Sequence, residues 1–297
     1  MKKTTANIFV NTSRSIIEPN VESINEYKIE DNGVEYNKIQ LDLETSFECS
    51  DKKIQYKLEQ IAKIYTLVIS KFEQNLRFGC PYFTLDWKNR NVQNNAEINF
   101  SNNSTLVTEK IGLVHQVICK NINVIKLYDL NAIYDNNYLE NEYNNLLLDN
   151  YYSACVSNRP QSKFFYLFVI WECYEDNDFF KNSFNEKLFS DIEIDDFLGV
   201  IKSSTDNYER KKSVIQEYKN RTLKSRSEKF YEYLINRNIS IVSESKITSS
   251  DIKKIIEQRD SLFHTSSKFD DKILYDKLFP IIQELLLMDV LKKLNGT

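Results

Sequence analysis

The C-terminal half contains the sequence SDIKKIIEQRDSLFH, residues 250–264, whose apolar spacing predicts a helix. On an ideal helix, with 100° between successive residues, its apolar residues form a single stripe. The members of this stripe are Ile252, Ile255, Ile256, Leu262 and Phe263. Arg259 falls at its centre. Because burying an unpaired guanidinium costs several kcal/mol, Arg259 must face an anion, an interface or a cleft.

The sequence on both sides of this helix carries further helical signals. Apolar periodicity predicts helices over 139–154, 163–175, 194–203, 207–221, 225–236 and 272–294. Residues 248–251 resemble a capping box, and Asn295-Gly296 is a suitable C-terminal stop. Pro280 is expected to kink or break the last helix. The second half is therefore predicted to be all-helical.

The N-terminal region mixes strand and helix signals. The Asp-Asn-Gly sequence at 31–33 predicts a hairpin that pairs 27–29 with 34–36. Runs of β-branched and aromatic residues predict further strands over 39–47, 82–87 and 113–127, and periodicity over 58–72 predicts one helix packed on the sheet. The predicted fold class is α+β. A β-rich mixed domain over 1–137 precedes an all-α bundle over 138–297, with the boundary at the Asn-rich segment 134–137.

Composition excludes several function classes. Of the 297 residues, 41% are hydrophobic and 28% are charged, which is typical of folded soluble proteins. Only five glycines are present, and the chain contains no dinucleotide fingerprint, P-loop, nucleophile elbow or HExxH motif. With only His115 and His264, a histidine-rich metal site cannot be built. We therefore predict neither a metal ion nor a cofactor.

The chain carries no signal for export or membrane insertion. Its longest nearly uninterrupted apolar run, 164–171, is far shorter than the roughly 18 residues that a spanning helix needs. The N-terminus lacks the apolar core of a secretory signal. Five cysteines, odd in number and never in a C-x-x-C pair, are typical of buried thiols in a reducing compartment. These features predict a cytoplasmic protein.

The net charge of −4 is unevenly distributed. Between 172 and 196 there are nine acidic residues and only two lysines, whereas 202–237 is rich in lysine and arginine. One hypothesis is that the acidic run pairs with the basic stretch of the same or a partner chain. Four of its residues could instead hold Mg²⁺, since that cation takes carboxylate oxygens. They are Asp191, Glu193, Asp195 and Asp196. The simpler interpretation is that these residues stabilise a helix N-terminus.

The basic stretch is interleaved with aromatic residues, a combination that binds phosphates and stacks on unpaired bases. The predicted RNA-binding residues are Lys211, Lys212, Lys219, Arg221, Lys224 and Arg226. The competing interpretation is an ordinary solvated helix face whose aromatic residues belong to the core.

Arg259, four residues and then His264 resemble the signature of the HEPN superfamily, in which Arg, four to six residues and His mark a ribonuclease site on a helical bundle. Asp260 supplies the polar residue that the family favours after the arginine. As in the family, the motif follows several helices and precedes one long terminal helix. The resemblance covers roughly 138–297 and implies a HEPN-like bundle there.

The resemblance implies a metal-independent endoribonuclease with catalytic residues Arg259, Asp260 and His264. The ribose 2′-OH attacks the adjacent phosphate, the guanidinium meets the charge on phosphorus, and the imidazole transfers protons. One histidine cannot act as base and acid in the same turnover. A homodimer with a composite site at its interface, as in the family, supplies both. The product would end in a 2′,3′-cyclic phosphate, and DNA would not be cut.

Many members of the superfamily join a variable recognition region to this bundle, often in bacterial antiphage or toxin systems. By that analogy 1–137 is a sensor or recognition domain for a trigger or regulatory partner. Two alternatives remain open. In the first, the bundle is a non-catalytic dimerisation or RNA-binding module, Arg259 forms an interhelical salt bridge and His264 caps its helix. In the second, the N-terminal region is the enzyme and the bundle assembles it.

Overall fold

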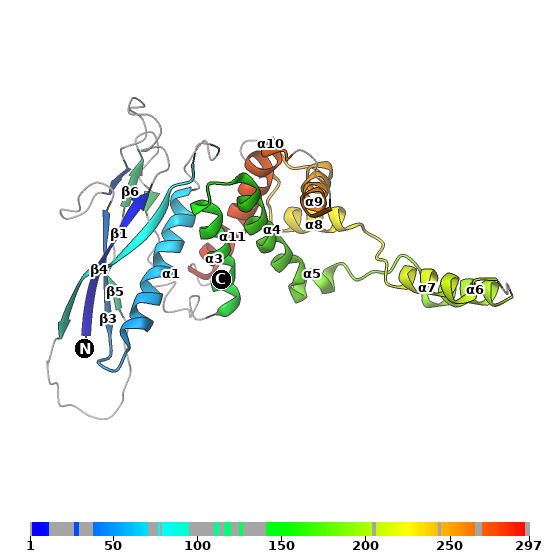
Figure 1. Cartoon of the computed structure of the whole chain (residues 1–297), viewed down its shortest axis with the longest axis horizontal. Coiled ribbons are helices and arrows are strands. Elements are labelled where there is room, and N and C mark those ends of the chain that lie inside the picture. Colours follow the sequence, from blue (N-terminus) through cyan, green and yellow to red (C-terminus); the bar gives the residue numbers. More distant parts are fainter. Residues whose placement is uncertain are drawn as a thin grey trace. The chain divides into compact units, whose positions relative to one another are not determined.

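The computed structural model of the chain contains both sheets and helices (Figure 1). The residues that it describes are 2–11, 27–29, 38–70, 77, 79–94, 110–112, 116–119, 125–126, 141–203, 206–242, 245–264 and 269–294. The chain forms two compact units. Unit 1 consists of Met1–Ile170 together with Phe279–Thr297, and unit 2 of Trp171–Leu278.

Most of the described strands lie in the first half of the chain. They are β1 (Lys2–Asn11), β2 (Tyr27–Ile29), β3 (Lys38–Thr45), β4 (Tyr82–Asn94), β5 (Lys110–Gly112), β6 (Gln116–Cys119) and β7 (Ile125–Lys126). One antiparallel sheet has the order β4-β1-β3-β5, and a second has the order β2-β6-β7. In unit 2, β8 (Ile241–Val242) pairs with β9 (Ser245–Lys246).

The core of unit 1 lies between the four-stranded sheet and helix α1 (Asp51–Ser70), which packs on β4 and β3 (Figure 1). Side chains alternate across a strand, so every second residue of β1 faces α1. Thr4, Ala6 and Ile8 are each at most 1% exposed. Ala6 lies opposite Leu41 of β3, which is also fully buried. This alternation explains why a strand with several polar residues forms the middle of the sheet.

Helices α3 (Glu142–Val156) and α11 (Phe279–Leu294) pack on α1, and a buried polar cluster joins the three. The hydroxyls of Ser70 and Tyr151 lie 2.5 Å apart. The side-chain amide of Gln283 donates to Ser70 Oγ at 2.9 Å and to Tyr151 Oη at 3.0 Å. Since an unpaired buried polar group costs about 1–3 kcal/mol, these mutual hydrogen bonds let polar side chains occupy the core.

A buried lysine caps the C-terminus of α3. The Nζ of Lys163, on α4 (Pro160–Asp176), donates to the carbonyl oxygens of Ala154 at 2.9 Å and Cys155 at 3.3 Å. Lys163 is only 5% exposed, and burial lowers the pKa of its amine. The two carbonyls belong to the last turn of α3, where backbone acceptors lack partners within the helix. Cys155 Sγ also lies 3.2 Å from Cys80 Sγ, and burial raises the pKa of the Cys155 thiol.

Unit 2 is mostly helical and has an aromatic core. After the end of α4, its helices are α5 (Asp178–Ser183), α6 (Asp191–Lys202), α7 (Tyr208–Lys219), α8 (Arg226–Asn236), α9 (Ser249–His264) and α10 (Asp271–Ile273), followed by a π-helix, η4 (Leu274–Leu278). The rings of Trp171 and Phe230 stack with centroids 3.5 Å apart. Phe180 and Tyr233 contact the same phenylalanine ring. The core therefore ties α4, α5 and α8 together.

The predicted helices of the second half are confirmed within a few residues, and Thr248 and Asp251 form the predicted capping box. The helix does not break at Pro280, which is the second residue of α11. The irregular segment lies just before it, where the π-helix η4 (Leu274–Leu278) changes to the α-helix. Proline lacks an N–H and crowds the carbonyl four residues earlier, which disfavours regular α-helical hydrogen bonding at this point. The short helix α5 was not predicted, and the paired strands β8 and β9 correct the prediction that the second half is all-helical.

The α+β class is confirmed, although the strands differ in detail from the prediction. The strands predicted at 39–47 and 82–87 correspond to β3 and to a longer β4, and the predicted helix is α1. The run 113–127, predicted as one further strand of that sheet, instead contains β6 and β7, which pair with each other in the second sheet. β1 was not predicted. The strand at 27–29 pairs with β6, while the turn at 31–33 and its partner at 34–36 lie outside the described residues.

The predicted boundary between 137 and 138 also lies outside the described residues and stays a prediction. The two compact units divide the chain at other points, within α4 and directly before α11. In the parts of the chain that the structure describes, no helix has both the length and the apolar character to span a membrane.

Candidate functional site

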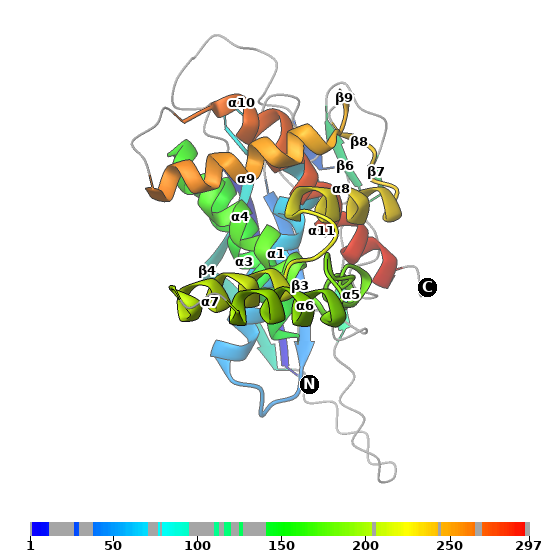
Figure 2. The same cartoon turned by 90° about the vertical axis from the view of Figure 1, so that its right-hand side faces the viewer.

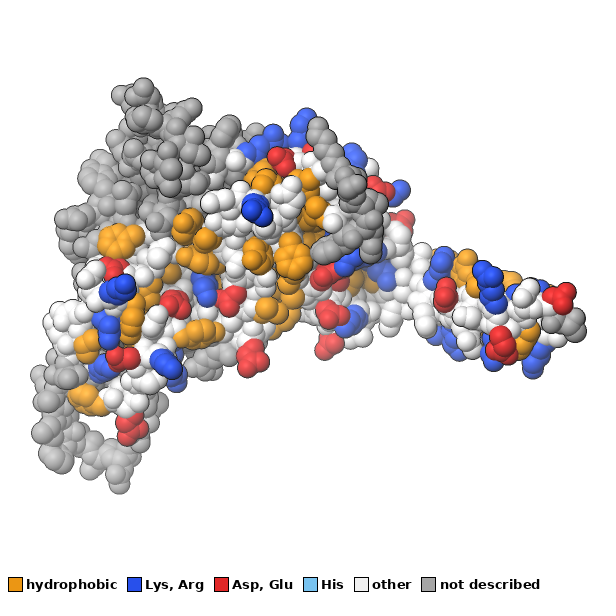
Figure 3. All heavy atoms as spheres, viewed as in Figure 1, with side chains coloured by type: hydrophobic (Ala, Val, Ile, Leu, Met, Phe, Trp, Pro, Cys, Tyr) orange, Lys and Arg blue, Asp and Glu red, His pale blue; other side chains and the backbone are white. Residues whose placement is uncertain are grey.

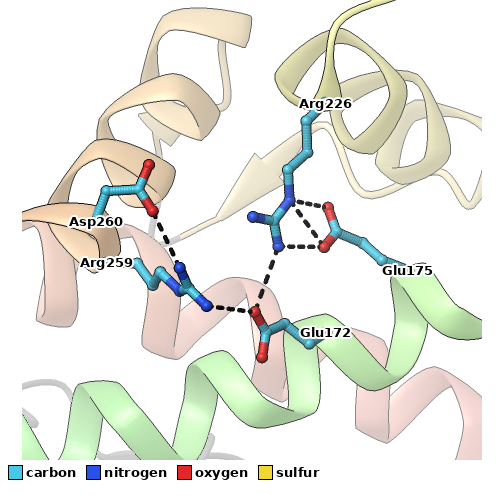
Figure 4. A network of polar contacts seen from close by, with 5 residues as sticks. All are labelled: Glu172, Glu175, Arg226, Arg259 and Asp260. Atoms are coloured by element: carbon cyan, nitrogen blue, oxygen red, sulfur yellow. Dashed lines mark hydrogen bonds and ion pairs between the residues drawn. The ribbon is translucent and has the colours of Figure 1, made fainter. Parts of the chain in front are cut away.

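Five charged side chains from three helices of unit 2 form one network around Arg259 (Figure 4). Glu172 and Glu175 lie one turn apart on α4, so both project from the same face of that helix. Arg226 is the first residue of α8, and Arg259 and Asp260 lie in α9. The N-cap Ser225 forms a capping box with Glu228, which fixes the start of α8 and therefore the origin of the Arg226 side chain.

Arg259 contacts two carboxylates. Its Nη2 lies 3.3 Å from Glu172 Oε1, and its Nη1 lies 3.2 Å from Asp260 Oδ1. The side chain is 31% exposed, compared with 43% for Glu172 and 55% for Asp260. The guanidinium is thus held by carboxylates at a site that solvent still reaches.

Arg226 completes the network from the other side. Its Nε donates to Glu175 Oε1 at 2.9 Å and its Nη2 donates to Glu175 Oε2 at 2.5 Å, a bidentate geometry that favours arginine. Its hydrogen bond to Glu175 raises the pKa of Arg226. The Nη2 of Arg226 also lies 3.7 Å from Glu172 Oε1, the same oxygen that Arg259 contacts. Two guanidinium groups therefore converge on one carboxylate oxygen.

The prediction that Arg259 sits at the centre of an apolar stripe requires a correction. Ile252 and Ile255 are fully buried, and the next buried residue of this line is Gln258, at 6% exposed. The buried face of α9 thus follows a spacing of three residues, and Arg259 lies at its border. Gln258 tolerates burial because its Oε1 accepts a hydrogen bond from the backbone of Asp270 at 3.0 Å.

The structure brings Arg259 and Asp260 together, but it does not test the third predicted catalytic residue. His264 is the last residue of α9, as expected from a helix ending there. Its side chain lies outside the described residues. The proximity of the imidazole to Arg259 stays a prediction.

The six predicted RNA-binding residues do not form one group. Lys211, Lys212 and Lys219 lie on α7, whereas Arg226 belongs to the network around Arg259. Several of these cations already have acidic partners. Lys219 Nζ lies 3.4 Å from Asp191, Lys212 Nζ lies 3.9 Å from Glu209, and Lys224 pairs with Glu232. Arg221 lies over the ring of Tyr218, with its Cζ 4.2 Å from the centroid.

The acidic residues at the start of α6 serve the helix itself. Glu193 forms a capping box with Ser190, and the backbone hydrogen bond from Ser190 lowers the pKa of Glu193. Asp191 pairs with Lys187 and Lys219, and the hydrogen bond from Lys219 lowers the pKa of Asp191. Within the described ranges, no group of three or more histidine, cysteine or acidic side chains is arranged to hold a metal ion.

Glu172 and Glu175 were not predicted as site residues. In the sequence they belong to an acidic run, and Arg259 follows Glu172 by 87 positions. A run of acidic residues does not reveal which member meets a distant arginine. Their spacing of three on a predicted helix was the only signal available, because it places both carboxylates on one face.

Comparison with models of protein families, with curated proteins and with solved structures finds no match for this chain.

Proposed function

We propose that the chain is a metal-independent endoribonuclease of the HEPN kind that acts as a homodimer, with Arg259, Asp260 and His264 in its catalytic site. The C-terminal helices would then be a HEPN-like bundle. An antiphage or toxin system is the setting that the resemblance implies, with the N-terminal region as the sensor.

One observation supports this proposal above the others: the guanidinium groups of Arg226 and Arg259 converge on a single oxygen of Glu172, at 3.7 and 3.3 Å. Two arginines directed at one anionic oxygen form the arrangement that binds a phosphate oxygen. In the free protein the Glu172 carboxylate occupies this position. A scissile phosphate would replace it, or join it if Glu172 rotates away.

The reaction requires three groups. A base removes the proton of the 2′-OH, the 2′ oxygen forms a bond to phosphorus, and the bond from phosphorus to the 5′ oxygen breaks as an acid protonates the leaving group. Arg259 stabilises the negative charge that gathers on the phosphoryl oxygens. His264 from each subunit would supply the base and the acid. The products carry a 2′,3′-cyclic phosphate and a 5′-hydroxyl.

A second candidate function is a non-catalytic helical dimerisation or RNA-binding module. The ion pair between Arg259 and Glu172 favours it, because a carboxylate on a neighbouring helix is what a purely structural arginine requires. In that case Arg259 stabilises the packing of α9 against α4 and contributes nothing to catalysis.

Cleavage of end-labelled RNA in the presence of EDTA separates these functions. The nuclease proposal expects chelator-resistant cleavage that Arg259→Ala and His264→Ala each reduce by at least about 100-fold, the usual range for loss of a group that stabilises the transition state. The matched control is Lys253→Ala, which removes a cation on the same helix whose side chain is 69% exposed. This variant should retain wild-type activity.

Cleavage that requires Mg²⁺, or that survives both substitutions, would refute the proposal. Loss of cleavage with loss of folding is recognised by far-UV circular dichroism. For that case Arg259→Lys is the second variant, because it keeps one positive charge for Glu172 but loses the planar fork that meets two phosphate oxygens. A folded Arg259→Lys protein with wild-type activity would favour the structural role.

A further inference from the structure

Helices α6 and α7 form a hairpin that packs mainly on itself. The two helices lie side by side in both Figure 1 and Figure 2. Backbone hydrogen bonds from Leu188 to Arg221 and from Leu223 to Glu186, at 2.9 and 2.8 Å, join the two ends of the hairpin. Among the described residues, Ile194 is the only buried residue of α6, and α7 buries none. Two helices alone cannot enclose a core, so a hairpin of this kind leaves apolar surface uncovered.

This uncovered surface is concentrated on one face. On ideal helices, Phe197 and Val200 of α6 are one turn apart, as are Val214 and Tyr218 of α7. Phe189 contacts the rings of both Phe197 and Tyr218, with centroids 5.8 and 6.1 Å away, which places the two pairs on the same side of the hairpin. These five residues are called the apolar face.

The apolar face is open to solvent. Phe197 and Val214 are each 45% exposed, and Val200 is 71% exposed. Figure 3 shows apolar side chains at the surface of the hairpin, between lysine, arginine and acidic side chains. Charged side chains of the same hairpin do have partners: Asp191 forms ion pairs with both Lys187 and Lys219. A cluster of large apolar side chains left exposed beside ion-paired polar residues is typical of an interaction surface.

The charges of the hairpin indicate which partner fits. Helix α6 carries four acidic residues and one lysine, whereas α7 carries four basic and two acidic residues. If two hairpins meet face to face around a two-fold axis parallel to the helices, α6 of one copy lies against α7 of the other. Acidic residues then meet basic residues across both halves of the interface. A nucleic acid is a poorer fit, because the acidic helix beside the face would repel its phosphates.

We propose that the apolar face binds the same face of a second copy of this chain and forms an antiparallel four-helix bundle. The bundle would bury the five residues of both copies in one core, and the opposite charges of α6 and α7 would select this pairing over α6 against α6. The proposal does not depend on the nuclease activity. The apolar face contains neither Arg259 nor His264, so this interface is separate from the composite site proposed above.

Two single substitutions at exposed positions of the 297-residue chain test the interface. Val200→Lys places a cation opposite the basic α7 of the partner, and Val214→Glu places an anion opposite the acidic α6. Analytical ultracentrifugation is expected to show a wild-type dimer, and each variant should raise the dimer dissociation constant at least tenfold. The matched control is Leu146→Glu, an equally drastic change at a 47% exposed position of α3. It should leave the dimer unchanged.

A wild-type chain that stays monomeric at about 100 µM, or a dimer that both variants retain, would overturn the proposal. Far-UV circular dichroism confirms that the variants remain folded, and if one of them does not, the other still gives the result. The same proteins are titrated with fluorescently labelled single-stranded oligouridine. If the substitutions abolish oligouridine binding and leave the sedimenting mass unchanged, the apolar face is an RNA surface and the dimer interface is refuted.

Discussion

Replacing the buried amine of Lys163 by the uncharged, similarly long side chain of methionine should destabilise unit 1. The substitution removes the hydrogen bonds from Nζ to the carbonyl oxygens of Ala154 and Cys155. Each buried acceptor left without a partner costs about 1–3 kcal/mol, and the favourable charge at the end of α3 adds about 0.5 kcal/mol. Burying an amine is itself unfavourable, and methionine relieves that cost. We expect a net loss of about 2 kcal/mol.

The stability difference should also depend on pH, because burial lowers the pKa of Lys163 below the 10.5 of an unfolded chain. At pH values between the lowered pKa of Lys163 in the folded state and 10.5, the unfolded chain binds more protons than the folded one. The unfolding free energy of the wild type therefore rises with pH in this window. Lys163→Met lacks this contribution. The difference in unfolding free energy between the wild type and the variant should therefore grow as the pH approaches 10.5. The hydrogen bonds of Lys163 persist in this range, because a neutral amine still donates two protons.

The assay is urea unfolding followed by tryptophan fluorescence in a Trp171→Phe background, in which Trp87 of β4 alone reports on unit 1. Unfolding free energies are compared from about pH 7.5 to 10. Lys52→Met, at an exposed position of α1, is the control and should change stability by less than about 0.5 kcal/mol. The reasoning is refuted if Lys163→Met matches this control, or if its deficit is the same at every pH.

Three further substitutions probe other contacts. Trp171→Ala removes the ring stacked on Phe230 and should cost about 3–5 kcal/mol in thermal unfolding, and a loss below about 1 kcal/mol would contradict the packing. Ser70→Ala leaves its buried hydrogen-bond partners incomplete and should lower stability by about 1–3 kcal/mol in urea unfolding, where no change would count against the polar cluster. Ser225→Ala removes the capping box of α8 and should cost about 1 kcal/mol; faster amide exchange in the first turn of α8 checks this, and unchanged exchange speaks against it.

Helices were the part of this fold most accessible from the sequence, because their apolar period and caps are local properties. The Thr248–Asp251 capping box could be recognised from four residues, and Pro280 indicated an irregular point in the helix for steric reasons that need no tertiary context. β1 was missed for the opposite reason. Its buried positions are Thr4, Ala6 and Ile8, and small or polar side chains give a weak alternation until the facing helix is known.

The candidate site was predictable only in part. Arg259 was conspicuous because a charge interrupts an apolar pattern, which indicated an anion, an interface or a cleft. Of these three, the structure shows an anion, Glu172. The identity of the anion depended on how α4 packs against α9, which no local pattern encodes. Arg226 illustrates the same point. Composition assigned it to the basic stretch, whereas packing places it on Glu175 and beside Glu172.

The position of α11 in the chain has a consequence for biosynthesis. Gln283 bonds to Ser70 across 213 positions, and every residue of unit 2 is synthesised between these two partners. During translation, α1 and α3 therefore emerge from the ribosome long before the helix that covers them. The exposed faces of α1 and α3 are expected to engage chaperones in this interval, because incomplete units with uncovered apolar surface aggregate. Unit 2, whose residues are contiguous, can fold before α11 is synthesised and unit 1 becomes complete.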